Sequence, residues 1–419
     1  MARFYDGSVD WAQLASEGGG LTKVAGNFEP QASRRRALRA EGFDPARLRR
    51  YAVFPFDVCW CYWTELSPLW NRPRPALVAQ AWAGNRFIIA RPSARRPDEG
   101  VPVYATAALP DHHLLDPNVV AIPFRLRQLP AADTGPAEQA TLPLLEETPR
   151  ANLSPAARRY LDALGMEGCD LDAGIAAAPW LHALAVILSP RYLAENADGV
   201  RRGYPRVPLP AAADALRASA DLGAEVAALM DTEVVVPGVT ATPREELRLV
   251  GVLAVLGGEA IEPARHLAVR AGWGRRAGDG PVMPGHGTLV ERGYSDEESQ
   301  AIEAGAARLG IEPREALALL GGSTFDVYLN ELVYWRNIPA NVWRYTVGGY
   351  QVLKKWLSYR EDGVLGRPLT RDEAREVTAT SRRIAALLLL QPRLDRNYDD
   401  AVAAPYEWRA AGDASAAAT

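Results

Sequence analysis

The segment 324–360 changes its hydrophobic period once, and this change constrains the fold more than any other feature of the chain. Residues 324–330 alternate apolar and polar side chains, a pattern typical of a half-buried strand. After the glycine pair at 348–349, apolar side chains recur at helical spacing, which leaves Lys354 and Lys355 on the opposite face. The segment therefore predicts a strand, a glycine turn and a short basic helix.

The same segment concentrates aromatic, basic and amide side chains. Arginine and lysine neutralise phosphates, and arginine, asparagine and glutamine can make paired hydrogen bonds to base edges. We therefore predict a DNA-contacting surface made of Arg336, Asn337, Arg344, Tyr345, Gln351, Lys354, Lys355 and Arg360. The alternative is that Trp335, Trp343 and Trp356 anchor the core and that the lysines form an ordinary solvated helix face.

These residues divide by the contacts that their chemistry favours. Guanidinium and amide groups can form bidentate contacts with bases, whereas a lysine acts chiefly as a point charge. The predicted base contacts are Arg336, Arg344 and Gln351. The predicted phosphate contacts are Lys354, Lys355 and Arg360.

Closely spaced motifs follow residue 323. They are Tyr-Trp-Arg-Asn-Ile-Pro at 334–339, Val-Trp-Arg-Tyr at 342–345, Gly-Gly-Tyr-Gln-Val-Leu-Lys-Lys-Trp-Leu-Ser-Tyr-Arg at 348–360 and Leu-Gly-Arg-Pro-Leu at 365–369. Together they resemble the C-terminal specificity region of type ISP restriction-modification enzymes and related adenine-specific DNA methyltransferases.

The resemblance extends upstream more loosely. Phe-Pro-Phe-Asp at 54–57, followed by Trp-Cys-Tyr at 60–62, is similar to an element of that family in which arginine usually stands at the position of Phe54. Residues 111–115 and 188–210 fit as well, so the resemblance covers most of 48–395 and is dense only after residue 323.

The resemblance implies a DNA target-recognition component, which positions double-stranded DNA for an adenine-N6 methyltransferase domain. The chain contains no Phe-x-Gly-x-Gly turn for S-adenosylmethionine, no Pro-Pro-Tyr loop for a flipped adenine and no Walker lysine motif. We therefore expect no catalytic or cofactor site here, with S-adenosylmethionine on a partner domain. The expected partners are double-stranded DNA, a methyltransferase subunit and, in a complete system, helicase or nuclease subunits. The chain looks like a family member that begins after its methyltransferase domain.

A second predicted DNA contact is a proline-stiffened loop that we call the Trp70 loop, residues 68–75. Its prolines forbid regular structure and leave four side chains available for contact: Trp70, Asn71, Arg72 and Arg74. The alternative is a crossover with Trp70 in the core. The glycine-rich stretch 272–288 lacks the phosphate-loop pattern and is expected to border the DNA surface.

Composition bounds the class of protein. With 419 residues and 48% hydrophobic content, the chain can bury a sizeable core. Neither a bilayer-spanning apolar run nor an apolar signal region occurs, which predicts a cytoplasmic protein without membrane contact. The net charge of −4 argues against DNA coating by bulk charge, but ten basic and five acidic residues lie within 336–383.

Cysteine and histidine give no site. The three cysteines cannot form a disulfide framework, and Cys59 and Cys61 are predicted to be buried reduced thiols in a strand. The five histidines lack ligand spacing, so no metal is predicted.

The predicted architecture is α+β, with a β-rich N-terminal part, a helical middle and a mixed α/β C-terminal part. The predicted regions are an N-terminal extension at 1–47, a β-rich recognition-like region at 48–130, a helical spacer at 150–260, the C-terminal specificity region at 261–395 and a tail at 396–419. Residues 130–150 form the connector.

Capping patterns and proline positions predict helices that begin at Pro155, Ala211, Ser295, Pro313 and Thr370. They also predict a buried helix over 179–188, a further helix over 242–257 and an end to the last helix near Pro392.

Two other functions stay open. One is a nuclease or a divergent methyltransferase with an unrecognised site, for which Glu245-Glu246 or Asp399-Asp400 would have to hold metal. The other is a protein-binding scaffold that keeps the fold without contacting DNA.

Overall fold

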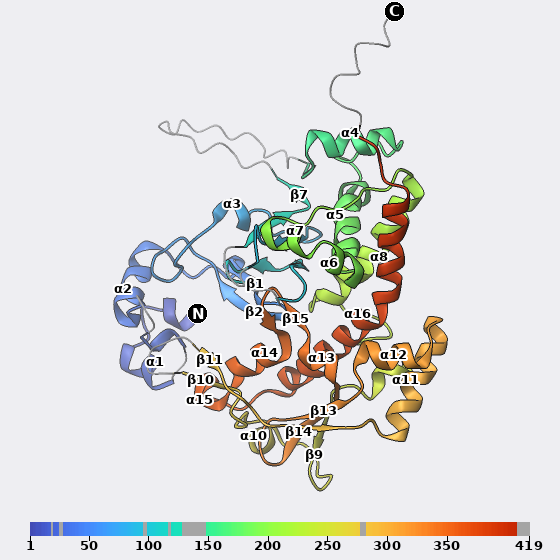
Figure 1. The fold of residues 1–419 in the computed structure, drawn as a ribbon. Coiled ribbons are helices and arrows are strands. Elements are labelled where there is room, and N and C mark those ends of the chain that lie inside the picture. The colour runs from blue at the N-terminus through green and yellow to red at the C-terminus, as the bar shows by residue number, and fades with distance from the viewer. Residues whose placement is uncertain are drawn as a thin grey trace, which may run out of the picture.

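The computed structural model describes residues 1–17, 20–24, 28–94, 99–115, 119–127, 148–276 and 282–408. Most of the predicted connector at 130–150 and the part of the predicted tail after residue 408 lie outside these residues. Figure 1 shows the helices of the middle part and the last long helix on one side and the N-terminal segments on the other. The predicted mixture of a β-rich N-terminal part, a helical middle and a mixed C-terminal part is confirmed.

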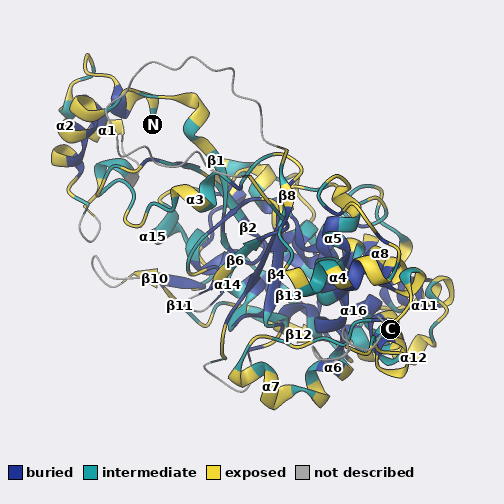
Figure 2. Ribbon diagram, turned by 90° about the horizontal axis from the view of Figure 1, so that it is seen from above, coloured by how far each residue is buried: buried dark blue, intermediate teal, exposed yellow. Residues whose placement is uncertain are grey.

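The N-terminal extension forms a small cluster of short helices at one end of the molecule (Figure 2). Its elements are η1 (Ala2–Tyr5), α1 (Trp11–Glu17), η2 (Gly20–Thr22), α2 (Pro30–Ala40) and η3 (Pro45–Arg47). They enclose their own apolar cluster, which includes Phe4 and Leu14. Arg34 of α2 is buried there and donates hydrogen bonds to the backbone oxygens of Phe4, Asp6 and Val9, so it is a structural side chain.

Two small sheets follow. In the first, β1 (Leu48–Phe54) pairs with β2 (Asp57–Tyr62) as an antiparallel hairpin and with β5 (Leu109–Pro110) in parallel. In the second, β3 (Phe87–Ala90) lies between β4 (Val103–Thr106) and β6 (Val120–Pro123). Helix α3 (Pro75–Val78) closes the Trp70 loop, and the pair β7 (Arg125–Leu126) and β8 (Arg150–Ala151) leads to the helices.

The helical middle is built on two long helices. Its elements are α4 (Pro155–Ala163), α5 (Ala173–Ile187), α6 (Pro190–Glu195), α7 (Ala197–Arg202) and α8 (Ala213–Met230). At the α5–α8 contact, a Cβ on Gly223 would lie 1.9 Å from the Leu181 carbonyl oxygen, so only glycine permits this approach. The prediction that a helix starts at Pro179 was wrong: α5 begins six residues earlier, at Ala173, with Asp172 as its N-cap, and Pro179 lies within it.

A four-stranded antiparallel sheet organises the C-terminal part, in the order β12 (Leu289–Arg292), β13 (Thr324–Tyr328), β14 (Val333–Pro339) and β9 (Val252–Val255). The helix predicted over 242–257 was wrong. Only α9 (Glu245–Arg248) is helical; Gly251 then adopts φ +64°, and 252–255 pair with β14. β-branched side chains and pairing with a distant strand outweigh the local helix signal. As a result, the predicted spacer and specificity region share one sheet.

Around this sheet lie α10 (Pro263–His266), the hairpin β10 (Gly274–Arg276) and β11 (Val282–Pro284), α11 (Asp296–Leu309), α12 (Pro313–Leu320), α13 (Ala340–Arg344), the hairpin β15 (Thr346–Val347) and β16 (Tyr350–Gln351), α14 (Val352–Arg360), α15 (Asp362–Leu365) and α16 (Arg371–Ala403). The prediction that α16 ends near Pro392 was wrong, because the helix continues for three turns beyond that proline. Burial of Leu394, Tyr398 and Ala401 offsets the hydrogen bond that Pro392 cannot donate. Figure 1 shows α16 alongside α8.

Candidate nucleic-acid interface

The segment 324–360 folds as its pattern predicts. It contains strand β13, the glycine turn between β15 and β16, and helix α14. Its three tryptophans are core residues with exposed fractions of 0% for Trp335, 6% for Trp343 and 4% for Trp356. For the tryptophans, the alternative that they anchor the core is therefore the one that the structure shows.

Asn337, Gln351 and Tyr345 serve the interior or its edge. Asn337 is buried at φ +58°, where its Oδ1 accepts from Thr324 Oγ1 at 2.8 Å and its Nδ2 donates to the Leu249 oxygen at 3.2 Å. Gln351 Nε2 donates to the Trp343 oxygen at 2.7 Å. Burial raises the pKa of Tyr345, which stays a neutral phenol. Asn337 has no surface left for DNA, so we remove it from the proposed contacts.

Arg360 is held by an internal ion pair. It donates two hydrogen bonds to the Asp57 carboxylate, one of them at 2.7 Å, and its guanidinium lies 4.3 Å from the Trp356 ring centroid. Its charge is thus neutralised within the protein, and we also remove Arg360 from the phosphate contacts. The pair joins α14 to the tip of the β1–β2 hairpin.

Lys355 lies over an aromatic cluster. Its Nζ is 4.3 Å from the ring centroid of Phe54 and 4.8 Å from those of Tyr350 and Tyr359. Such cation–π contacts stabilise an ammonium group over rings that are themselves packed together. Lys355 therefore joins β1, the β15–β16 hairpin and α14.

Three cations of the predicted surface have no carboxylate partner among the residues that the structure describes. Among the described residues, Arg336, Arg344 and Lys354 make no ion pair. Arg344 is exposed at the end of α13, and its guanidinium lies 5.7 Å from the Phe325 ring centroid. Arg336 on β14 and Lys354 on α14 are half-exposed. These three are the side chains that best fit a polyanion.

The β10–β11 hairpin extends this basic region beside α14. A Cβ on Gly274 would lie 1.9 Å from the Ser358 oxygen, so the hairpin and helix are in backbone contact. Arg275 and Arg276 on β10 are exposed. This position agrees with the expectation that the glycine-rich stretch borders the predicted surface, although its residues 277–281 lie outside the described residues.

The Trp70 loop borders a cavity of about 490 Å³. Its walls include Trp70 and Tyr51, whose rings meet edge to face at 5.3 Å. Asn71 and Arg72 are exposed at the rim, whereas Arg74 Nη2 donates to the Pro110 oxygen at 2.5 Å. The loop thus presents an amide and a guanidinium beside an aromatic wall.

Asp111 and a histidine pair complete this cavity. The Tyr51 hydroxyl donates to the Asp111 carboxylate. Burial lowers the pKa of His112, and the neighbouring His113 and Arg74 side chains lower it further. His112 is therefore neutral at pH 7 and can both donate and accept hydrogen bonds.

Comparison with known families decides the classification. Residues 21–386 match the Type ISP C-terminal specificity domain. The chain belongs to this family. None of the curated proteins compared with the chain matches it.

Three solved structures show a partial similarity to the chain, each with a TM-score below 0.5. A nuclease-deletion mutant of the Type ISP enzyme LlaGI, in complex with a DNA substrate mimic, is 12% identical with a TM-score of 0.48, over 94% of this chain and 30% of that one. The Type ISP enzyme LlaBIII bound to DNA is 11% identical with a TM-score of 0.49, over 90% and 20%. The DrdV–DNA complex is 17% identical with a TM-score of 0.49, over 97% and 33%. The chain thus spans between 20% and 33% of these proteins.

The carboxylate pairs considered for metal binding have structural partners. Glu246 is buried and pairs with Arg308, and Asp399 pairs with Arg191. Asp399 and Asp400 lie on α16, not on a tail as predicted. Within the described ranges, no three His, Cys, Asp or Glu side chains form a group that could hold a metal ion.

Two further observations concern the cysteines and the membrane. Cys59 and Cys61 are free thiols on β2, half-buried rather than fully buried, and burial raises the pKa of Cys61 to about 12. In the part of the chain that the structure describes, no helix combines the length and apolarity needed to cross a membrane.

Sequence analysis missed the partners that hold this region together. Asp57, Phe54 and Tyr359 were quoted only as parts of family motifs, yet they bind Arg360 and Lys355. The only hint in the sequence that these residues meet was that the motifs at 54–57 and 348–360 occur in the same chain. Nothing local to either motif indicates that they meet.

Proposed function

We propose that this chain recognises a target sequence in double-stranded DNA and positions it for an adenine-N6 methyltransferase domain that lies outside these 419 residues. The observation that carries the proposal is the match of 21–386 to a specificity domain. The side chains without carboxylate partners in its densest motif region support it, because unpaired guanidinium and ammonium groups suit phosphates and base edges.

The proposed roles rest on the chemistry of these side chains. Arg344 and Arg336 contact base edges, and Lys354 contacts phosphates, because a planar guanidinium can make bidentate contacts and an ammonium cannot. The Trp70 loop forms a second contact through Asn71 and Arg72. Gln351 and Lys355 contact the Trp343 oxygen and the Phe54 ring, and Tyr345 is packed against the protein, so these three side chains have structural roles.

We assign the catalytic steps to partner domains or subunits. A methyltransferase domain binds S-adenosylmethionine and transfers the methyl group, and helicase or nuclease subunits complete the restriction system. The chain acts in the cytoplasm, where it meets DNA. A nuclease, a divergent methyltransferase and a scaffold remain predictions that no observation here favours.

The test selects bound duplexes from a random library with the purified chain, then measures affinity for the enriched and a scrambled sequence. We expect one enriched sequence and a preference of roughly 100-fold or more. Co-expression with the methyltransferase should place N6-methyladenine in that sequence. Recovery of a random pool, both for the chain alone and for the complex, would overturn the proposal.

A further inference from the structure

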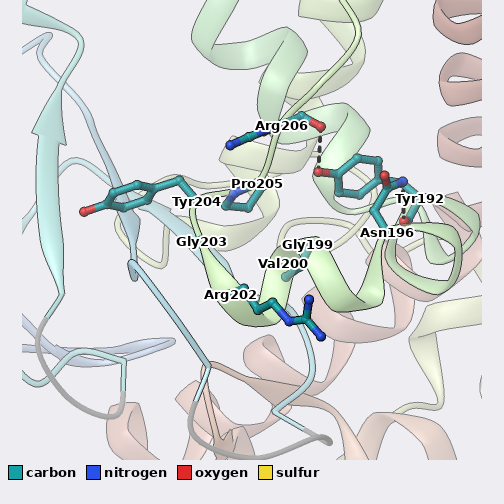
Figure 3. Close-up of a pocket in the computed structure, with 9 residues that line it drawn as sticks. All are labelled: Tyr192, Asn196, Gly199, Val200, Arg202, Gly203, Tyr204, Pro205 and Arg206. Atoms are coloured by element: carbon teal, nitrogen blue, oxygen red, sulfur yellow. Dashed lines mark hydrogen bonds between the residues drawn. The ribbon is translucent and has the colours of Figure 1, made fainter.

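A cavity of about 600 Å³ lies outside the surfaces described above, between α6, α7 and the segment 203–206. Figure 3 shows Tyr204 on one side of it and Tyr192 with Asn196 on the other. Arg202 and Arg206 also line it. The volume exceeds what a single phosphate ion fills and suits a larger ligand.

The arginines of this segment have no ion-pair partner in the described part of the chain. Arg201, Arg202 and Arg206 are exposed, and none of them makes an ion pair with any described carboxylate. Glu195, which precedes Asn196 in the sequence, accepts from the Tyr398 hydroxyl at 2.9 Å. Asp198 on α7 is the one acidic residue within 196–206. The segment therefore carries an excess of positive charge.

The backbone beneath these side chains is fixed. The hydroxyl of the buried Tyr192 donates to the Arg206 oxygen at 2.8 Å, and Asn196 Nδ2 donates to the Tyr192 oxygen at 3.0 Å. At the other end, the Ala94 amide donates to the Arg201 oxygen at 3.1 Å. The guanidinium groups thus extend from an ordered support, which lowers the entropy lost when they bind a ligand.

The arrangement suits an extended polyanion better than a small ion. In Figure 3 the guanidinium groups of Arg202 and Arg206 point to opposite ends of the cavity. Two separated cations match the repeated charges of a nucleic-acid backbone. Tyr204, which is 45% exposed, offers a ring that can pack against a sugar or a base.

One stretch of the chain contacts both the segment 196–206 and the hairpin that follows Arg344. After the contact between Ala94 and Arg201, the chain reaches Val101, which pairs with Val347 of β15. The Gly349 amide donates to the Glu99 oxygen at 2.9 Å. Ala94 and Glu99, five positions apart in the sequence, thus contact the basic segment and the β15–β16 hairpin, respectively.

We propose that this cavity binds the sugar–phosphate backbone of DNA, with Arg202 and Arg206 on separate phosphates and Tyr204 against the sugar. This inference rests on the proposed function and adds a sequence-independent anchor to it. Such an anchor contributes equally to every sequence and strengthens the salt dependence of binding.

The experiment compares two double variants of the full chain by fluorescence polarisation with labelled duplexes at several salt concentrations. R202A/R206A removes the proposed anchors. R191A/R217A removes the same number of charges from arginines that have carboxylate partners, Asp399 and Asp214. We expect R202A/R206A to weaken specific and random duplexes alike, by about tenfold or more, and to reduce the salt slope by about two. R191A/R217A should match the wild type.

Further arms make every outcome decisive. R202K/R206K keeps the charges and should keep most of the salt slope, so it distinguishes loss of charge from loss of folding. Thermal unfolding checks that both alanine variants are folded. Inorganic phosphate and deoxyadenosine monophosphate are titrated as probes of a free-ligand site. Saturable mononucleotide binding with an unchanged duplex affinity in R202A/R206A overturns the inference. If wild type and R202A/R206A bind duplexes with the same salt slope, the inference is also overturned, but the proposed function still stands. If the wild type and its methyltransferase complex bind no duplex, both fail.

Discussion

Arg360 of α14 and Asp57 at the tip of the β1–β2 hairpin form a two-hydrogen-bond ion pair between residues 303 positions apart. Their side chains are 14% and 5% exposed. The pair fixes the basic helix relative to the first sheet, and Lys355 over Phe54 adds a second contact between the same two elements. The orientation of α14, and with it of Lys354, therefore depends on a strand far away in the sequence.

Breaking this pair should destabilise the protein strongly. Asp57→Asn leaves the Arg360 charge without a counter-ion in a largely desolvated site, and such losses cost about 3–5 kcal/mol. Arg360→Lys keeps the charge but loses the fork geometry, so it should cost less. Urea unfolding of both variants and of the D57N/R360K double variant gives the coupling free energy. A coupling near zero would show that the pair does not hold α14.

The Arg360–Asp57 pair also shows where prediction from sequence reaches its limit. Strand β13 and helix α14 were predictable because their periods are local properties of the chain. The pairing of 252–255 with β14 was not, since a local capping pattern favoured a helix and the partner strand lies 78 or more residues away along the sequence. The internal roles of Asn337 and Arg360 were missed for the same reason.

Protonation of Glu373 should weaken the start of α16. A hydrogen bond from Arg367 lowers the pKa of Glu373 to about 2, with further help from the Thr370 amide in the capping box. A carboxyl whose pKa is lower when folded stabilises the protein above its ordinary value of 4.5, and this stabilisation is lost as pH falls from 4.5 toward 2. Glu373→Gln should cost about 1 kcal/mol at pH 7.

The difference in the free energy of unfolding between wild type and Glu373→Gln should shrink as the pH falls below 4.5, the ordinary pKa of a glutamate. Urea unfolding at neutral pH and at several acidic values measures it. Arg367→Ala serves as the matched variant, because it removes the main cause of the lowered pKa. A gap that is constant across this range would show that the charge on Glu373 contributes nothing.

The two arginines of the Trp70 loop should behave differently. Arg72 is exposed, so Arg72→Ala should weaken DNA binding by about threefold to tenfold at low salt and leave folding unchanged. Arg74 donates to the Pro110 oxygen, so Arg74→Ala should lower the free energy of unfolding by about 1 kcal/mol. Fluorescence polarisation measures the DNA affinity of both variants, and thermal unfolding measures their stability. Identical behaviour of the two variants would contradict the division between surface and support.

Arg344 and Lys354 test the division between base and phosphate contacts. Arg344→Ala should cost roughly 1–3 kcal/mol on the selected sequence and little on random DNA, because a bidentate base contact discriminates between bases. Lys354→Ala should weaken all sequences similarly and reduce the salt slope by about one. Arg217→Ala is the control: Arg217 pairs with Asp214 on α8, so this variant should leave the DNA affinity unchanged.

Salt titrations on specific and random duplexes measure the affinity of all three variants, with the methyltransferase complex used where the chain alone binds weakly. If neither Arg344→Ala nor Lys354→Ala differs from the control while folding is intact, recognition lies elsewhere, and the Trp70 loop with Asn71 and Arg72 becomes the first surface to test.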